Sequence, residues 1–316
     1  MPYANIISRT DAAALITEQV SDVMMRGITQ QSAAIQLFRN VPVGTNATRV
    51  PLASALPTAY WVNPTDVGLK QTTETNWTSA YLYIEELAAI VVIPNSVLDD
   101  SSVDILGMIE PQLIEAVAIA FDAAVFFGTN APASFPDDLT TAATAAGNVA
   151  VRGTAAGTAG GIAEDINQLL GTLEADGYVA TGIVANPTMK ARLRGARDST
   201  GQLLLDVNGG TANVWGIPTV YPMGIGWPAA VSSPEAFALQ RENFLVGIRQ
   251  DFTVTVHTEG VITDAAALVT YNLMQQDLTA VRVVFRAGWV AGNPVNRAQP
   301  TEANRYPAAV LTSPAS

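Results

Sequence analysis

The chain has 316 residues, of which 49% are hydrophobic and 14% are charged, so it can bury one large core or two ordinary ones. It contains no cysteine, which excludes a disulfide framework and a thiolate metal site. The net charge of −12, from 28 acidic and 16 basic residues, does not favour a surface that grips nucleic-acid phosphate.

Residues 1–44 are expected to form an arm. Apolar residues at near-helical spacing between Asp11 and Ile28 predict one amphipathic helix, after which residues 32–43 should be extended. The N-terminal segment has a charge at Arg9 and lacks an apolar signal core, and no uninterrupted apolar run approaches a membrane span. We therefore expect a soluble chain that is not exported and does not contact a membrane.

Residues 45–90 contain two β-rich runs, TRVPLASALPTAYWV and NWTSAYLYIEELAAIVVI, on either side of a polar tip at residues 63–75. This pattern predicts a long antiparallel hairpin. Arms of about 15 residues would reach roughly 50 Å, whereas a compact chain of this length has a radius of gyration of about 20 Å. We therefore expect the hairpin to lie on a neighbouring subunit.

The strongest helical pattern lies within residues 91–160. Ser101 and Asp104 have the spacing of a capping box, which marks a helix start. Pro111 suits the first turn of a helix. We therefore expect a short helix, a kink and then a second helix over about residues 111–127.

The remaining segments differ in composition. Residues 129–160, rich in Ala, Gly and Thr, should form a loop or a weak hairpin. Residues 161–265 alternate between helical and strand patterns, beginning with a helix that closes at Gly177, as in an α/β body. Residues 266–297 include the alternating strand DLTAVRVVFRAGWVA, and the Pro-, Ala- and Ser-rich tail, 298–316, is expected to be partly disordered.

Polar residues show no pattern typical of a catalytic or metal site. The single histidine, His257, lies in an alternating strand, and no G-x-S-x-G motif or zinc-ligand spacing accompanies it. The glycine-rich stretch RGTAAGTAGG lacks the lysine of a phosphate-binding loop. We expect no catalytic residue, no metal, no cofactor and no enzymatic activity. A soluble α/β enzyme stays open as a remote alternative, which would require a convergent polar pocket.

Six residues are candidates for contacts between subunits. Trp61 and Trp77 flank the hairpin tip, where aromatic side chains suit an interface, although packing within the hairpin is an equal alternative. Of the 16 basic residues 14 are Arg, which suits bidentate contacts between subunits, although a genomic bias in composition explains the excess equally well. The candidates are Arg49, Trp61, Lys70, Trp77, Arg197 and Asp198.

Four stretches, in this order and spacing, carry a resemblance to a known family. They are RVPLASALPTAYWVNP; IPNSVLDDSSVDILGMIEPQLIEAVAIAFDAAVFFG; IVANPTMKARLRGARDSTGQLLL with GIPTVYP; and QDLTAVRVVFRAGWVAGNP. The chain resembles the major capsid proteins of tailed bacteriophages with the HK97 fold. The resemblance implies an α+β, HK97-like subunit with an N-arm (1–44), an E-loop hairpin (45–90), a P-domain with a spine helix (91–160), an A-domain (161–265), returning P-domain strands (266–297) and a C-terminal tail (298–316).

This resemblance implies a structural protein that self-assembles as hexamers and pentamers into an icosahedral shell around a double-stranded DNA phage genome. The expected partners are other copies of the chain, a separate scaffolding protein, a portal, decoration proteins, and packaged DNA held without specific binding. The expected location is the virion, after assembly in the host cytoplasm. An encapsulin-like nanocompartment is the alternative. Since only 44 residues precede the hairpin, we expect no fused scaffold and little N-terminal processing.

In some members of this family, an E-loop lysine forms a covalent cross-link with an asparagine of a neighbouring subunit, and a glutamate acts as the base. Lys70 matches the lysine, whereas Asp277 stands at the position of the glutamate and Thr270 at that of the asparagine. Asn272 is two residues out of register, a displacement of about 7 Å along a strand. We therefore expect Lys70 to be solvated or to form an ordinary interface ion pair.

Overall fold

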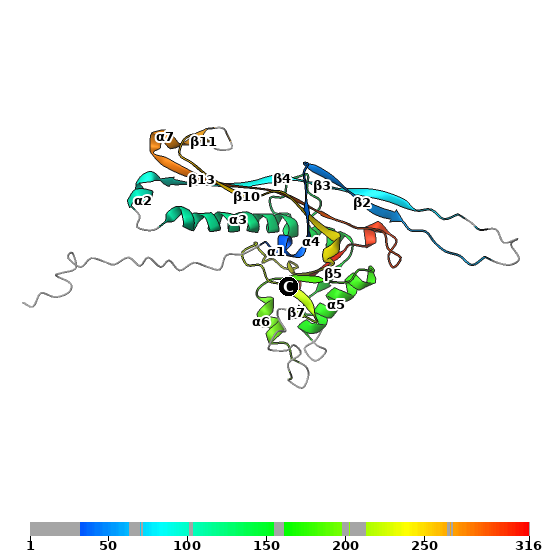
Figure 1. Ribbon diagram of the computed structural model, residues 1–316. Helices are drawn as coiled ribbons and strands as arrows, with labels where there is room; N and C mark the ends of the chain where they lie inside the picture. Colours follow the sequence, from blue (N-terminus) through cyan, green and yellow to red (C-terminus); the bar gives the residue numbers. More distant parts are fainter. Residues whose placement is uncertain are drawn as a thin grey trace, which may run out of the picture.

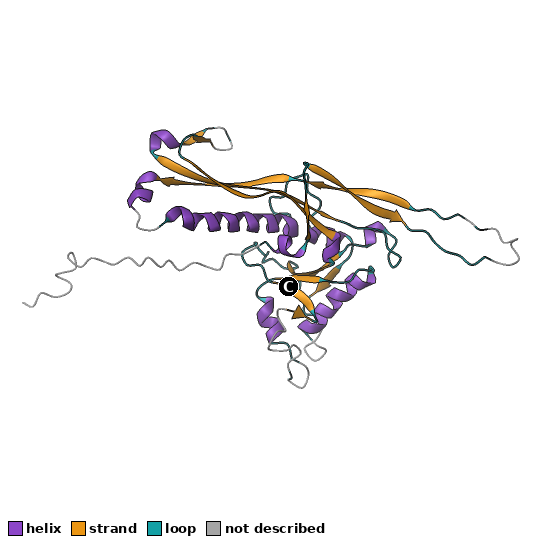
Figure 2. Ribbon diagram, in the orientation of Figure 1, coloured by secondary structure: helices purple, strands orange, loops and turns teal. Residues whose placement is uncertain are grey.

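The computed structural model describes residues 32–62, 70, 72–100, 104–154, 161–197, 202, 213–263, 266 and 268–315. The molecule is elongated, with a strand-rich upper layer, a long helix beneath it and a second, helix-flanked sheet below (Figures 1 and 2). A two-stranded hairpin projects from one end (Figure 1). The amphipathic helix expected between Asp11 and Ile28 lies outside the described residues.

A four-stranded sheet forms the upper layer, in the order β1-β10-β13-β4. Its two long central strands, β10 (Phe244–His257) and β13 (Leu278–Ala291), are antiparallel. They confirm the two strands predicted near the end of the chain. β4 (Glu85–Pro94) pairs antiparallel with β13, and β1 (Arg39–Pro42) pairs parallel with β10.

The helix α3 (Ile105–Phe127) packs along one face of this sheet. Its N-terminus is capped by Asp104, whose carboxylate accepts a hydrogen bond from Gly107 N at 3.0 Å. The predicted start and kink near Pro111 were wrong, because this cap starts the helix earlier and Pro111 lies inside it. Burial of the apolar stripe compensates for the one backbone hydrogen bond that the proline removes. The short helix expected before Pro111 is the first part of α3 itself, and a separate helix, α2 (Asn95–Asp100), precedes it and was not predicted.

A second sheet of six strands forms the lower body, in the order β5-β14-β9-β6-β8-β7. The helices α5 and α6 belong to this body, and Gly177, at φ 79°, follows α5 as predicted. The strands and helices of this body are β5 (Val149–Val151), α5 (Ile162–Ala175), β6 (Gly182–Ala185), α6 (Met189–Arg194), β7 (Asn213–Val214), β8 (Ile217–Val220), β9 (Pro234–Leu239) and β14 (Ala308–Thr312).

Three expectations from the sequence need correction. The tail from residue 298 is not a disordered end, because its β14 is fully buried between β5 and β9. Residues 129–160 are more than a loop, since they contain α4 (Leu139–Ala145) and β5. β10 falls within the segment expected to form the A-domain, yet it pairs with β13 in the upper sheet. The assignment of segments to named domains otherwise remains a prediction.

The hairpin consists of β2 (Ala47–Ala55) and β3 (Asn76–Tyr83), which pair antiparallel and confirm the predicted topology. The paired strands are shorter than the expected arms, because the pairing ends at Ala55 and Asn76 on the side of the tip and the second run continues beyond residue 84 as β4. Residues 32–43 are only partly extended, since α1 (Ala33–Leu37) precedes β1. At the opposite end of the molecule lie β11 (Val261–Thr263), β12 (Val269–Asn272) and α7 (Leu273–Gln276).

The main core lies between α3, the upper sheet and one face of the lower sheet. Phe38, which follows α1, stacks on Phe244 at 4.9 Å between ring centroids. Phe285 stacks on Phe252 at 4.4 Å and meets the edge of Phe121 from α3 at 6.0 Å. These rings join the arm, α3 and the upper sheet, and Phe126 of α3 contacts Phe237 of β9 in the lower sheet, with ring centroids 5.4 Å apart.

Candidate subunit interface

The hairpin exposes aromatic side chains for which the subunit itself offers no opposing layer. Trp61 is 99% exposed and Trp77 is 71% exposed. Tyr81 and Tyr83 alternate along β3 and stack on each other, with ring centroids 6.2 Å apart. Aromatic rings on an exposed two-stranded sheet are typical of a surface that another protein covers.

A second group of exposed apolar side chains lies at the opposite end of the long axis, around β11, β12 and α7 (Figure 1). Met274 is 80% exposed and Val269 is 63% exposed. The exposed apolar residues at this end are Val256, Val261, Leu268, Val269, Tyr271 and Met274. The molecule therefore has apolar surface at both extremes of its length.

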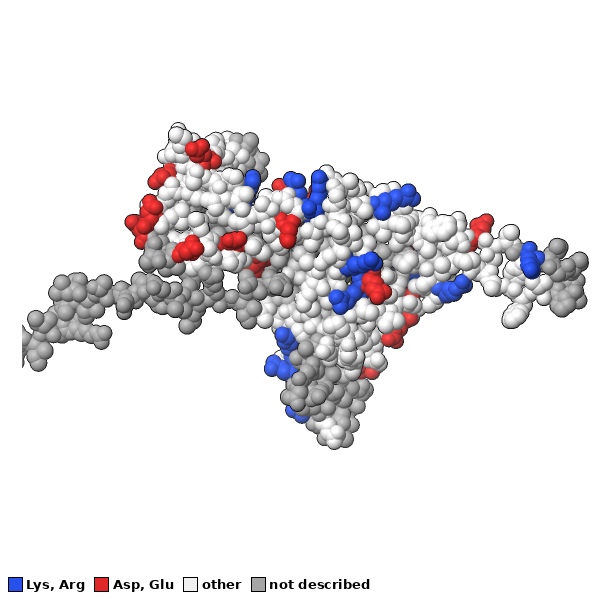
Figure 3. Space-filling model, viewed as in Figure 1, with Lys and Arg blue, Asp and Glu red and all other residues white. Residues whose placement is uncertain are grey.

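The two ends differ in charge. Figure 3 shows carboxylates gathered at the end that carries α2 and α7, on the left of the view. In the sequence, the segments 95–110 and 257–277 contain no Lys or Arg. Their acidic residues are Asp99, Asp100, Asp104, Glu110, Glu259, Asp264 and Asp277. Two copies that met at this end would repel each other, so the charge pattern favours contacts between unlike ends.

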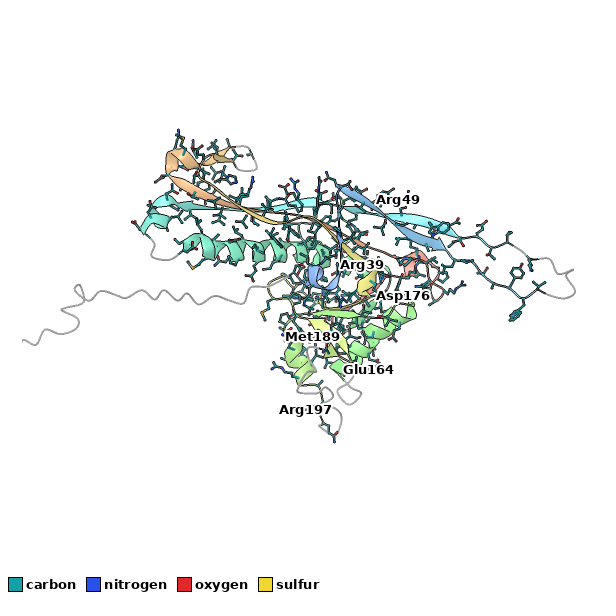
Figure 4. The ribbon with its side chains drawn as sticks, in the orientation of Figure 1. Arg39, Arg49, Glu164, Asp176, Met189 and Arg197 are labelled. Carbon is teal, nitrogen blue, oxygen red and sulfur yellow. The ribbon has the colours of Figure 1, made fainter. Side chains whose placement is uncertain are left out.

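The structure gathers four of the six candidate contact residues on the hairpin. Arg49 Nε donates a hydrogen bond to Ser79 Oγ across the two strands. Lys70 is exposed near the tip, with Trp61 and Trp77 on the segments that flank it. Arg197 is also exposed but lies at the far tip of the lower body, well away from Arg49 (Figure 4). Asp198 lies outside the described residues, and the role of all six in contacts stays a prediction.

Two residues at or near the positions of the family's cross-link partners have other structural roles within the subunit. Asp277 is exposed, and its carboxylate accepts a hydrogen bond from Asn95 Nδ2 at 2.6 Å. Asn272 caps α7 by accepting a hydrogen bond from Gln275 N. Neither is held in an apolar pocket of its own subunit. The expectation that Lys70 forms no cross-link stays a prediction.

His257 occupies an ordinary strand position, as predicted. It pairs with Ala280 in the β10–β13 ladder, and its Nε2 lies 3.0 Å from Thr255 Oγ1. Across the described ranges, no cluster of three or more potential metal-ligating side chains occurs. No helix in the same ranges is both long and apolar enough to cross a membrane.

A cavity of about 220 Å³ lies between α3, β4 and β13. Its walls are largely apolar and include Phe121 and Phe285. The carboxylate of Glu85, which also lines the cavity, accepts a hydrogen bond from Ser134 Oγ. This lining does not supply the convergent polar groups of an active site.

Asp122, a buried carboxylate in α3, was not predicted from the sequence. Asp122 is fully buried and accepts hydrogen bonds from Ser32 Oγ, Ala33 N and Ala34 N, which lie where the arm enters the body. Burial raises the pKa of Asp122 to about 6, although the three hydrogen bonds oppose the shift. A lone acidic residue in the apolar run FDAAVFF is the signal that could have identified it.

The subunit has two sheets, a long helix (α3) and a hairpin that carries exposed aromatic side chains and extends beyond the body. This arrangement is the HK97-like fold of capsid shell proteins. Residues 12–296 match the model of the phage capsid family, and the chain belongs to that family. The fold and the family proposed from the sequence are therefore confirmed.

Relatives of this chain include proteins of phages named for Microbacterium and Mycobacterium. A solved structure from Microbacterium phage Oxtober96 is 31% identical, covers 98% of this chain and 100% of its own, and has a TM-score of 0.84. One from Mycobacterium phage Adephagia is 27% identical, with 99% of each chain covered and a TM-score of 0.85. The probable major capsid protein gp17 of Mycobacterium phage D29 is 26% identical over 200 residues. That alignment spans 59% of this chain and only 56% of the curated relative.

Proposed function

We propose that this chain is the major capsid protein of a tailed phage and that it assembles as hexamers and pentamers into an icosahedral shell around double-stranded DNA. The observation that carries the proposal is the projecting hairpin, whose Trp61 and Trp77 are exposed in the isolated subunit. Its role is structural and not enzymatic. The shell is part of the virion and is assembled in the host cytoplasm.

Burial of these aromatic side chains can drive the assembly. One tryptophan side chain buries roughly 200 Å², which corresponds to about 5 kcal/mol at 25 cal/mol per Å² as an upper limit. Each subunit contributes one hairpin and accepts another, so even weak contacts add up around a closed shell. The acidic end formed by α2 and α7 opposes pairing between like ends and favours a head-to-tail order.

The main partners are further copies of the chain. A separate scaffolding protein, a portal and decoration proteins complete the proposed assembly. Packaged DNA is enclosed without specific binding, which is consistent with a net charge of −12. An inner wall that repels phosphate would let the genome move during filling and release.

The proposal is tested by electron microscopy of the purified protein, together with a variant that lacks the outer hairpin. Ala55 and Asn76 are partners at the end of the β2–β3 ladder, so residues 56–75 can be replaced by an Asn-Gly turn. The full chain should form closed shells, and the shortened chain should remain a folded subunit by circular dichroism and sedimentation. Normal shells from the shortened chain would contradict the proposal. Particles from the natural source that contain protein cargo without DNA would favour a nanocompartment.

A further inference from the structure

Two legs from opposite edges of the upper sheet join the hairpin to the body. One leg leaves the edge strand β1 at Val43, and the other enters the edge strand β4 after Ile84. Because β10 and β13 lie between these edges, the two legs must together span the central strands before they pair with each other. They meet where Ile84 N donates a hydrogen bond to Asn46 O at 2.9 Å.

Two glycines lie directly beneath this crossing. Gly247 of β10 and Gly288 of β13 are partners in the antiparallel ladder. A β-carbon on Gly288 would overlap the carbonyl oxygen of Tyr83. A β-carbon on Gly247 would lie 2.5 Å from Leu82 Cδ2 and 2.8 Å from Val43 Cγ2. Neither glycine has a positive φ, so the requirement is for space and not for an unusual backbone conformation.

The surroundings of this glycine pair are closely packed. Val43, Leu82 and Ile84 form a small buried cluster with Val290 of β13. The β4–β13 ladder ends at the pair Glu85 and Ala287, immediately before Gly288. The legs therefore pack on the backbone of the central strands at the point where the pairing of β4 with β13 stops, while β10 and β13 remain paired.

A second support lies further along the hairpin. Val295 N donates a hydrogen bond to Ala53 O at 2.9 Å, and Arg297 Nη2 donates one to Pro57 O at 2.6 Å. The hairpin is thus held at its base by the glycine pair and along its length by the segment that follows β13. Contacts at these two places along the hairpin fix the direction in which it points.

We propose that Gly247 and Gly288 are positioning residues for shell assembly, which seat the legs against the sheet and fix the direction in which the hairpin leaves the body. This inference rests on the proposed function, because the direction matters for a hairpin that docks on another copy. The nine residues of β2 extend about 30 Å. A tilt that begins at the base therefore produces its largest displacement at the tip.

The test measures the direction of the hairpin and shell formation in the same variants. Since the chain has no cysteine, Asn76→Cys on the hairpin and Glu174→Cys on α5 can carry spin labels in the full chain. Gly288→Ala should change the label distance by several ångströms and abolish regular shells, and Gly247→Ala should act in the same way but less strongly. Adding Leu82→Val to Gly247→Ala removes the Cδ2 atom and should shift the distance back toward the wild-type value.

The matched control is Gly44→Ala. Gly44 lies in the leg that leaves β1, and a β-carbon there would have no atom within 4 Å. Both the distance between the spin labels and the formation of shells should therefore remain unchanged. Regular shells and an unchanged distance in Gly288→Ala would overturn the inference and leave the proposed function intact. If that variant does not fold, the same result in Gly247→Ala would overturn it. A broad distance distribution in the wild-type free subunit would also overturn it, whereas failure of the wild type to form shells would contradict the proposed function.

Discussion

Ser32 Oγ donates a hydrogen bond to Asp122 Oδ1 and thereby ties the start of α1 to the C-terminal part of α3. Asp122 also accepts hydrogen bonds from the backbone of Ala33 at 2.7 Å and of Ala34 at 3.1 Å. No cation contributes to this set of hydrogen bonds. Hydrogen bonds from neutral donors offset only part of the free-energy cost of burying a charged carboxylate. The charge state of Asp122 therefore affects the stability of the folded chain.

The first prediction concerns pH. Burial raises the pKa of Asp122 from 3.8 to about 6, so the folded chain binds this proton more tightly than the unfolded chain. The stability that protonation of Asp122 contributes is therefore fully present below pH 3.8 and is lost as the pH rises through about 6. The loss corresponds to roughly 3 kcal/mol. Asp122→Asn should remove this dependence in urea unfolding measured between pH 4 and pH 7, whereas Glu110→Gln, which removes an exposed carboxyl from the same helix, should not.

The second prediction concerns the cap of α1. Ser32 Oγ accepts a hydrogen bond from Ile35 N at 3.1 Å while it donates to Asp122. Ser32→Ala removes both interactions and should lower the free energy of unfolding by about 1–3 kcal/mol. Ser32→Thr keeps the hydroxyl and should lose much less. Equal losses in the two variants would show that the hydroxyl is unimportant.

The third prediction concerns the core under the upper sheet. Phe285 is 1% exposed and packs against Phe252 and Phe121. Phe285→Ala should lower the free energy of unfolding by about 3–5 kcal/mol, because it leaves a cavity that the rigid sheet cannot close. Val256→Ala, at a 53% exposed position in the same sheet, should change it by less than about 1 kcal/mol. Denaturant unfolding of the two variants checks the difference.

The fourth prediction separates assembly from folding. Trp61→Ala and Trp77→Ala remove exposed rings, so the stability of the free subunit should stay within about 0.5 kcal/mol of wild type. The protein concentration required for shell formation should rise about tenfold or more in each variant, since tenfold corresponds to 1.4 kcal/mol per contact. Light scattering over a concentration series measures this threshold. An unchanged threshold in both variants would argue against a role for these rings in subunit contacts.

The fifth prediction concerns Lys70. Mature particles boiled in denaturant should run on a gel as single subunits, because Asp277 is exposed and bonded to Asn95 instead of acting as a base in an apolar pocket. A ladder of covalent multimers that disappears in Lys70→Ala would contradict this expectation.

Elements with strong local patterns could be predicted from the sequence. β13 has an apolar residue at every second position of RVVFRAGW, and the β2–β3 hairpin has β-rich runs on both sides of a polar tip. The start of α3 was mispredicted because Pro111 gave the more obvious signal, while the cap at Asp104 determined the start. β14 was missed because the short run AAVLT lies within a segment whose composition resembles that of a disordered tail.

Features that depend on long-range contacts could not be read from the sequence. The partner of Asp122 is 90 residues away at Ser32, and no local pattern connects the two. Gly247 and Gly288 are unremarkable in their own strands, and their importance arises only where the hairpin legs cross them. The order and spacing of whole segments carried the family resemblance, and no single motif did so.

The position of β14 has a consequence for synthesis on the ribosome. β5 and β9 are translated long before residues 308–312, yet β14 must insert between them to complete the lower sheet. Until then, each strand presents an open edge with unpaired backbone groups. A polypeptide whose translation stops before Ala308 would keep those edges open and become a target for chaperones or proteases. The late synthesis of β14, relative to β5 and β9, would thus keep products truncated before it out of the particle.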